Sequence, residues 1–235
     1  MDKSLVSVTH YTILATKKYL RNLPYPVHID VLLATSPTDP QSCSPIEDPQ
    51  LWPTYGNVKA SFQNITLMAK PGDFVHVHYS GHGTRIEPSP TNQYIGDVAL
   101  VLLEGQNGNM IRYLREVELA HIINTIVQKG VLVTLVLDCC FSGGVSREED
   151  FNSIRSLSYS AKVDAAYLPL PKESVSVPIN NTGSRDGSML PNWLINPDKY
   201  TILAVCGPHE VAREIALKDG KRHGALFYLL LDTLS

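Results

Sequence analysis

Two apolar runs, each closed by residues capable of chemistry, constrain this chain of 235 residues more than any other feature. The run Val131–Leu137 is rich in β-branched residues and is typical of a strand buried on both faces of an α/β sheet. It leads into Asp138-Cys139-Cys140-Phe141-Ser142-Gly143, and a second run, Asp73–Tyr79, leads into Ser80-Gly81-His82-Gly83. Because open α/β sheets place functional residues at the carboxyl ends of their strands, we expect a thiol and an imidazole at one sheet edge.

A thiol and an imidazole at one edge can form a nucleophilic pair. Cysteine reacts as the thiolate, and a neighbouring imidazole lowers the thiol pKa and can protonate a leaving amine. Glycines beside His82 and after Cys140 let a substrate backbone approach and leave amides for an oxyanion. A lone cysteine at a strand end usually serves packing, and we interpret Cys139 in this way. His76 and His78 alternate with valines, and one or both are interpreted as ordinary strand residues rather than ligands.

Composition excludes several other classes of protein. A net charge of −3 argues against a nucleic-acid partner. No apolar stretch reaches the roughly 18–20 residues of a membrane span, and because the chain starts with polar residues we expect no secretory signal. Four cysteines, two of them adjacent, form no secreted disulfide framework, so we expect a reducing cytoplasm or nucleus. No spacing of cysteines and histidines matches a zinc site.

Apolar periodicity and turn residues divide the chain into alternating helices and strands. Helices are expected at Thr12–Asn22, Asn57–Ala69, Arg115–Gln128 and Gly224–Leu234, and strands at Val27–Thr35, Asp73–Tyr79, Val98–Leu103, Val131–Leu137 and Tyr200–Val205. Asn57 is expected to cap its helix. The length suits a single domain over residues 1–235. Residues 145–192 are rich in Ser, Pro and Asn, and we expect a flexible linker or a surface insertion there.

The two strand-end motifs together resemble the metacaspases and the caspase-like domains of fungi, in the caspase-haemoglobinase clan of cysteine peptidases. The motifs are His78-Tyr79-Ser80-Gly81-His82-Gly83-Thr84 and Asp138-Cys139-Cys140-Phe141-Ser142-Gly143, with support from Lys70–Asp73, Tyr113–Arg115 and Ala204–Pro208. The similarity begins near Ile13 and is poor over 145–182. It implies a caspase-like three-layer sandwich, in which helices flank a mostly parallel central sheet.

The resemblance also implies a role for each site residue. His82 is the general base and acid, Cys140 is the nucleophile, and Cys139 is a bystander. Ser80 and Asp138 line the specificity pocket, and the carboxylate there implies cleavage after Arg or Lys. The backbone amides of Gly83 and Cys140 hold the oxyanion. The substrates are then proteins or peptides, with neither nucleic acid nor membrane as a partner and the oligomeric state left open. The family further suggests a place in programmed cell death.

The chain departs from the family pattern at its start and at the family's calcium site. Residues 1–12 hold no strand of the kind that opens the family fold, so we expect an N-terminally incomplete domain. Asp97 and Glu116 match acidic positions of calcium-dependent members, but Val117 offers no side-chain oxygen and Arg147 places a cation where an acid is expected. Calcium takes six to eight oxygen ligands. We therefore expect no cofactor, with calcium disfavoured.

Three functional hypotheses follow from these residues. The first is a cysteine endopeptidase of metacaspase type, cleaving after basic residues through His82 and Cys140. The second is an inactive binding or signalling module of the same fold, which the missing first strand motivates. The third is an α/β cysteine enzyme that hydrolyses a bond other than a peptide bond. A thiol-reactive probe carrying a basic peptide separates the three.

Overall fold

A parallel sheet of three strands lies at the centre of the computed structural model, which describes residues 17–22, 24, 26–37, 39, 42, 44–86, 98–139, 157–167, 200–205, 214–216, 222–224 and 233. The strands are β1 (Phe74–Ser80), β5 (Leu132–Asp138) and β6 (Tyr200–Ala204), in the order β1-β5-β6. All neighbours in this sheet run parallel. The predicted strands at these places are confirmed to within one residue, and so is the α/β class.

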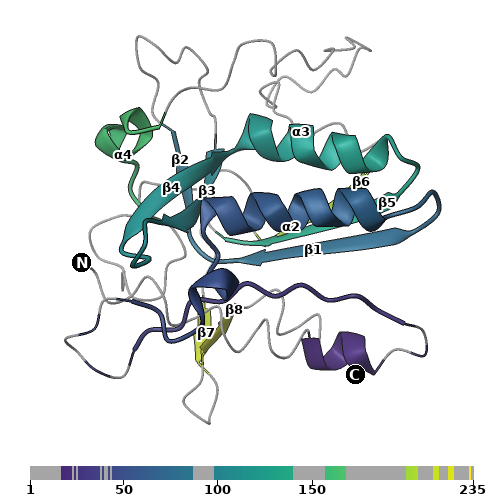
Figure 1. Cartoon of the computed structure of the whole chain (residues 1–235), viewed down its shortest axis with the longest axis horizontal. Coiled ribbons are helices and arrows are strands. Elements are labelled where there is room, and N and C mark those ends of the chain that lie inside the picture. The colour runs from purple at the N-terminus through teal and green to yellow at the C-terminus, as the bar shows by residue number, and fades with distance from the viewer. Residues whose placement is uncertain are drawn as a thin grey trace.

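Two helices, α2 (Tyr55–Met68) and α3 (Glu116–Val127), cover one face of this sheet, as Figure 1 shows. Alternate residues of β5, namely Val133, Leu135 and Leu137, are buried beneath them. We call the resulting set the large core cluster. Its buried members are Tyr55, Phe62, Val98, Leu100, Leu102, Leu114, Leu119, Ile123, Ile126, Val131, Val133, Leu135, Leu137, Cys139 and Tyr200. Each large aliphatic side chain buried here contributes about 1.5–3 kcal/mol to folding.

Helix α2 begins two residues earlier than the sequence pattern predicts. Thr54 is its N-cap, and the Thr54 side chain accepts a hydrogen bond from the Asn57 amide at 3.1 Å. The predicted cap, Asn57, instead donates from its side chain to the carbonyls of Pro49 and Trp52. The expectation that Asn57 caps the helix is therefore wrong, because the hydroxyl of Thr54 lies where it can satisfy the amide three residues ahead.

A second, antiparallel sheet stands beside the first. It comprises β2 (Gly83–Arg85), β3 (Val98–Glu104) and β4 (Met110–Arg115), in that order. Only β3 was expected. The turn between β3 and β4 uses Gly105 and Gly108 at φ +82 and +60, a left-handed conformation that glycine adopts without strain. Alternate residues of β3 face opposite ways: Val98, Leu100 and Leu102 join the large core cluster, whereas Ala99 and Val101 join Ile86 and Tyr113 in a small core cluster.

The predicted strand Val27–Thr35 is not found. Residues 26–37 have no regular secondary structure, and the segment is held by other contacts, such as the Leu33 amide bonded to the Leu51 carbonyl at 2.7 Å. The reason is spatial: a cavity lined by Asp30–Ala34 on one side and His76–Ser80 on the other separates this segment from β1. An extended run becomes a strand only when a neighbour lies within hydrogen-bonding distance.

Other predictions are met in part. Residues 17–21 are helical, and the rest of the predicted helix at 12–22 lies outside the described residues except position 22, a turn. Gly224 belongs to β8 (Arg222–Gly224), paired with β7 (Glu214–Ala216), so the final helix does not begin there. A 3-10 turn, η2 (Pro49–Leu51), precedes α2. None of the described helices is long and apolar enough to cross a membrane.

Part of the predicted linker is an ordered piece of the structure. Residues 157–167 are described and contain a short helix, α4 (Ala161–Ala165). Leu157, Tyr159 and Val163 pack against the small core cluster. The other residues of the range 145–192 lie outside the described part of the chain.

Candidate active site

Strands β1 and β5 bring two of the predicted site residues together at their carboxyl ends. The parallel register sets Ser80 opposite Asp138, and the Ser80 hydroxyl donates to Asp138 Oδ2 at 3.5 Å. Ser80 is buried and Asp138 has no exposed surface. A carboxylate removed from water is costly unless polar partners surround it, and the serine hydroxyl is one such partner. The edge expected from the sequence is thus present, with a serine and a carboxylate at its base.

The predicted base, His82, lies in a turn just beyond β1 that is tied to both sheets. The His82 carbonyl accepts a hydrogen bond from the Val101 amide of β3 at 3.0 Å, and the Tyr79 hydroxyl donates to the same oxygen at 2.7 Å. The Gly81 amide donates to the Asp138 carbonyl at 3.4 Å. A Cβ at Gly81 would lie 2.8 Å from the Tyr79 hydroxyl oxygen, so any larger residue there would displace the Tyr79 side chain.

The predicted nucleophile, Cys140, lies outside the described residues, so its distance from His82 stays a prediction. Its neighbour Cys139 follows β5 directly and is only 1% exposed within the large core cluster. This burial supports the interpretation of Cys139 as a packing residue. The Asp138 carbonyl accepts a hydrogen bond from the Gly81 amide, so the end of β5 lies next to the His82 turn.

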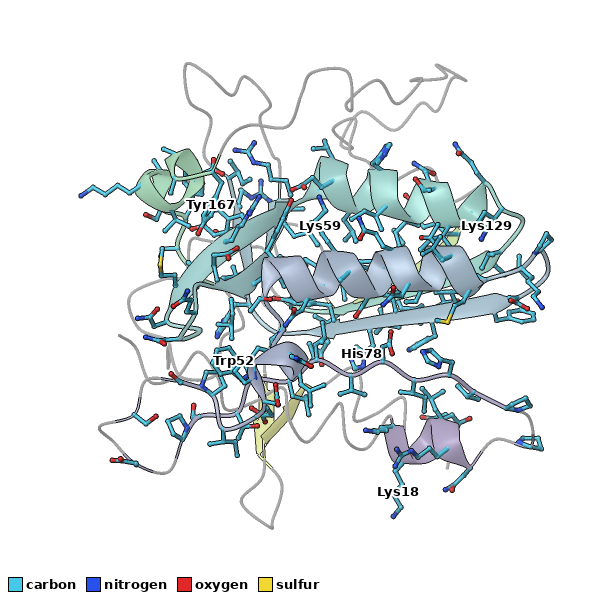
Figure 2. The ribbon with its side chains drawn as sticks, in the orientation of Figure 1. Lys18, Trp52, Lys59, His78, Lys129 and Tyr167 are labelled. Atoms are coloured by element: carbon cyan, nitrogen blue, oxygen red, sulfur yellow. The ribbon has the colours of Figure 1, made fainter. Side chains whose placement is uncertain are left out.

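A cavity of about 240 Å³ opens beside this edge. Its walls include Ser80 and His82 on one side and the extended residues Asp30–Ala34 on the other. His78 belongs to β1 and also lines the cavity (Figure 2). The remaining lining is mainly apolar and includes residues of α2, β3, β4, α3 and β5. Asp138 has no exposed surface and reaches this cavity only through its contact with Ser80. A side chain entering the cavity therefore meets Ser80 and His82, together with Asp30 and two further histidines, on a wall that is otherwise largely apolar.

Gly83, the predicted oxyanion residue, is the first residue of β2 and is buried. Its carbonyl accepts a hydrogen bond from the Leu157 amide at 2.9 Å. The next residue, Thr84, is fully buried, and its Oγ1 has no hydrogen-bond partner within the described part of the chain. The backbone that follows His82 is thus enclosed by β3 on one side and by the segment from Leu157 on the other.

Comparison with known proteins identifies the family of this chain. A family described as metacaspase, peptidase C14 domain, matches residues 19–147, more than half of the chain. The chain belongs to the metacaspase family. Among curated relatives, metacaspase-9 of Arabidopsis thaliana is 33% identical over 101 residues, which cover 41% of this chain and 29% of the relative. Metacaspase III c of Phaeodactylum tricornutum is 30% identical over 95 residues, covering 40% and 27%. The chain thus matches under a third of the length of these relatives.

A solved structure shares the fold. The crystal structure of protein GSU0716 from Geobacter sulfurreducens superposes with a TM-score of 0.52 at 18% identity, over 97% of this chain and 72% of that one. At this identity the likeness concerns the fold alone. It agrees with the mixed α/β arrangement of the metacaspase chain, in which helices flank a parallel sheet.

Of the two acidic residues that match the family's calcium site, the structure describes only Glu116. Glu116 is buried at the start of α3, and its Oε2 accepts a hydrogen bond from the Val98 amide at 3.2 Å. Asp97 and Arg147 lie outside the described residues. Among the residues that the structure describes, no group of three or more His, Cys, Asp or Glu side chains could hold a metal ion. The expectation about calcium in this metacaspase therefore stays a prediction.

Sequence reasoning missed the residues that hold the His82 turn from outside. Tyr79 belongs to the strand motif, but only the structure places its hydroxyl on the His82 carbonyl. Leu157 lies in the range interpreted as linker, and nothing in the local pattern indicates that it reaches Gly83. The two are separated by 74 residues in the chain, from 83 to 157, so only tertiary folding brings them together.

Proposed function

We propose that this metacaspase chain is a cysteine endopeptidase in which Cys140 is the nucleophile and His82 is the general base and acid. The observation that carries the proposal is the pairing of Ser80 with Asp138. It joins the strand that leads to His82 with the strand that leads to Cys140. The ties from the His82 turn to β3 and to Asp138 support it, because a catalytic imidazole must be held in place.

The proposed reaction follows from this placement. His82 takes the proton of the Cys140 thiol, and the thiolate attacks the carbonyl carbon of the scissile bond. The amides of Gly83 and Cys140 hold the oxyanion. His82 then protonates the leaving amine, so the C–N bond breaks and a thioester remains. Water, deprotonated by His82, hydrolyses the thioester, and the thiol regains its proton.

We propose further that the residue before the cleaved bond is Arg or Lys. The Asp138 carboxylate lies beneath Ser80, which lines the cavity beside His82. A negative charge in a site of low dielectric attracts a cationic side chain and repels a carboxylate. The contribution of a charge-assisted contact is about 1.5–3 kcal/mol, which corresponds to roughly 10-fold to 100-fold in rate.

The dyad is tested with adjacent cysteine variants. Fluorogenic peptides ending in Arg or Lys are given to the wild type, Cys140→Ala and the matched control Cys139→Ala. We expect Cys140→Ala to abolish cleavage and Cys139→Ala to keep most of it, because the buried Cys139 serves packing. His82→Ala is expected to lose roughly 10²-fold to 10⁴-fold in kcat, the usual share of general acid–base catalysis. Equal loss in the two cysteine variants would undo the assignment.

Specificity is tested with a peptide library in which only the residue before the scissile bond varies. The wild type should prefer Arg and Lys, and Asp138→Asn should reduce this preference while cleaving neutral peptides at a similar rate. Asp as the favoured residue in the wild type would contradict the proposed pocket.

Calcium is tested separately with the wild type and Asp97→Ala. Because Val117 supplies no side-chain oxygen and Arg147 adds a positive charge to the expected site, we propose that activity is nearly equal in chelator and in added calcium. Saturable activation by calcium that disappears in Asp97→Ala would show that the chain holds the ion after all.

An inactive binding module is the alternative, and one observation favours it. Residues 26–37 stand apart from β1 across the cavity instead of pairing with it as a strand. A wild type that cleaves none of the library, and whose Cys140 fails to react with a thiol probe carrying Arg, would support the module and contradict the peptidase.

A further inference from the structure

The segment 157–167, which we call the clasp, begins beside the His82 turn and packs against the antiparallel sheet. At its first residue the Leu157 amide donates to the Gly83 carbonyl at 2.9 Å. Leu157, Tyr159 and Val163 pack on the small core cluster. The clasp thus meets the sheet through a backbone bond next to His82 and through apolar contacts farther along.

An ion pair ties the clasp to the end of β4. The Arg115 guanidinium donates from Nη2 to Asp164 Oδ2, and the Tyr159 hydroxyl donates to the same oxygen at 2.9 Å. The side chains of Arg115 and Asp164 are 28% and 17% exposed. Pairs withdrawn from water in this way are screened less by salt than pairs on an open surface. Asp164 is therefore the point at which two side chains from different elements meet.

Tyrosines reinforce the same attachment. The Ser160 amide donates to the Tyr113 hydroxyl at 3.0 Å, and the rings of Tyr113 and Tyr159 stack with centroids 5.7 Å apart. At the far end the Arg112 guanidinium carbon lies 4.4 Å from the centroid of the Tyr167 ring, which Figure 2 places close to α4. Together with the ion pair, these contacts hold the clasp along β4 from Leu157 to Tyr167.

Two hydrogen bonds from different parts of the chain hold two consecutive carbonyls of the His82 turn. Val101 of β3 holds the His82 carbonyl, and Leu157 of the clasp holds the next carbonyl, that of Gly83. If the clasp detaches, one of these two restraints is lost while the other remains. The imidazole then keeps its place in the fold but gains freedom of orientation, to which proton transfer is sensitive.

We propose that Asp164 is a positioning residue for His82, acting through its ion pair with Arg115 and the Leu157–Gly83 hydrogen bond. This inference rests on the proposed function of His82 and adds a residue that does not touch the reacting atoms. Asp164 fixes the clasp, the clasp fixes the Gly83 carbonyl, and the Gly83 carbonyl limits the motion of the catalytic turn.

The experiment uses the full chain with Asp164→Ala, Asp164→Glu and the exposed control Lys162→Ala on the same short helix. Three readouts are taken: amide hydrogen exchange at Leu157, the pH profile of Cys140 alkylation by iodoacetamide followed by peptide mapping, and kcat and KM on an Arg peptide. In Asp164→Ala we expect faster exchange at Leu157, a displaced alkylation profile, and kcat lower by roughly 10-fold to 100-fold with little change in KM. Asp164→Glu should recover part of each effect, and Lys162→Ala should match the wild type.

The outcomes separate this inference from the proposed function. Faster exchange at Leu157 with an unchanged alkylation profile and kcat would overturn the positioning role, because the clasp would then be structural only. Unchanged exchange would overturn it too. If the wild type cleaves nothing but Asp164→Ala still displaces the alkylation profile, the peptidase proposal fails and the positioning inference stands. Should Asp164→Ala unfold, Tyr113→Phe removes only the acceptor of the Ser160 amide and is expected to act in the same direction, more weakly.

Discussion

The two faces of strand β3 are packed by different kinds of interaction. On one face Val98, Leu100 and Leu102 enter the large core cluster, whose attraction is mainly apolar burial. On the other, Ala99 and Val101 meet the clasp, which adds an ion pair, tyrosine hydroxyls and a stacked ring pair to its apolar contacts. Apolar burial is large and has no preferred direction, whereas each polar contact is smaller and demands a geometry. The large core cluster thus supplies stability, and the clasp orients the His82 turn.

The largest loss of stability is expected from a substitution at a fully buried position of the large core cluster. Leu135→Ala at the fully buried centre of β5 should lower the free energy of unfolding by about 2–5 kcal/mol, because it leaves a cavity. Urea denaturation measures the change. The matched control is Leu132→Ala in the same strand, at a side chain 54% exposed. If both leucines cost the same, burial does not explain the stability of this side.

A smaller effect is expected where a buried carboxylate touches the large core cluster. Glu118 accepts a hydrogen bond from the Tyr55 hydroxyl and lies 3.8 Å from Lys59 Nζ. Glu118→Gln should cost about 1–3 kcal/mol, since it removes a charged acceptor in a buried position. In the same assay, Glu104→Gln should cost about 0–1 kcal/mol because the Arg112–Glu104 pair is more exposed. A larger loss in Glu104→Gln would reverse the comparison.

A still smaller coupling is expected in the clasp. A double-mutant cycle with Arg115→Gln and Asp164→Asn should give an interaction energy of about 0.5–1 kcal/mol, read from urea midpoints. This energy should shrink when the salt concentration rises, because the pair is partly exposed. The cost of Leu135→Ala should not shrink with salt. A coupling that is insensitive to salt would mean that the clasp behaves like the large core cluster.

A separate effect is expected from titration of the clasp in alkali. Burial, aided by the bond to Asp164, raises the pKa of Tyr159 to about 12. The folded state therefore holds this proton more tightly than the unfolded state, whose tyrosine titrates near its usual pKa of about 10. The contribution of Tyr159 to the free energy of unfolding is present below pH 10 and is lost as the pH rises toward 12. Tyr159→Phe should lose less stability than the wild type over this interval in thermal unfolding; equal losses would exclude Tyr159 as the cause.

Much of the fold follows from local pattern, and the parts that do not have clear physical reasons. The β-branched run 131–137 and the run 73–79 are apolar enough to be strands wherever the chain is compact, and both are found. The segment 26–37 has the same character but lacks a neighbour at hydrogen-bonding distance, so it is extended without being a strand. The clasp lies in a longer Ser-, Pro- and Asn-rich range that indicates a linker, yet its side chains find partners on β4.

By itself the sequence determined which residues can carry chemistry: a histidine and a cysteine pair, each after an apolar run, in the pattern of a metacaspase. Those features are local, since they depend on residue type and on spacing of a few positions. Only the tertiary structure decided that Ser80 meets Asp138, that Cys139 is enclosed by the large core cluster, and that Leu157 reaches Gly83. Such contacts join residues far apart in the chain, and they form because the chain must bury its apolar runs and satisfy its backbone hydrogen bonds together.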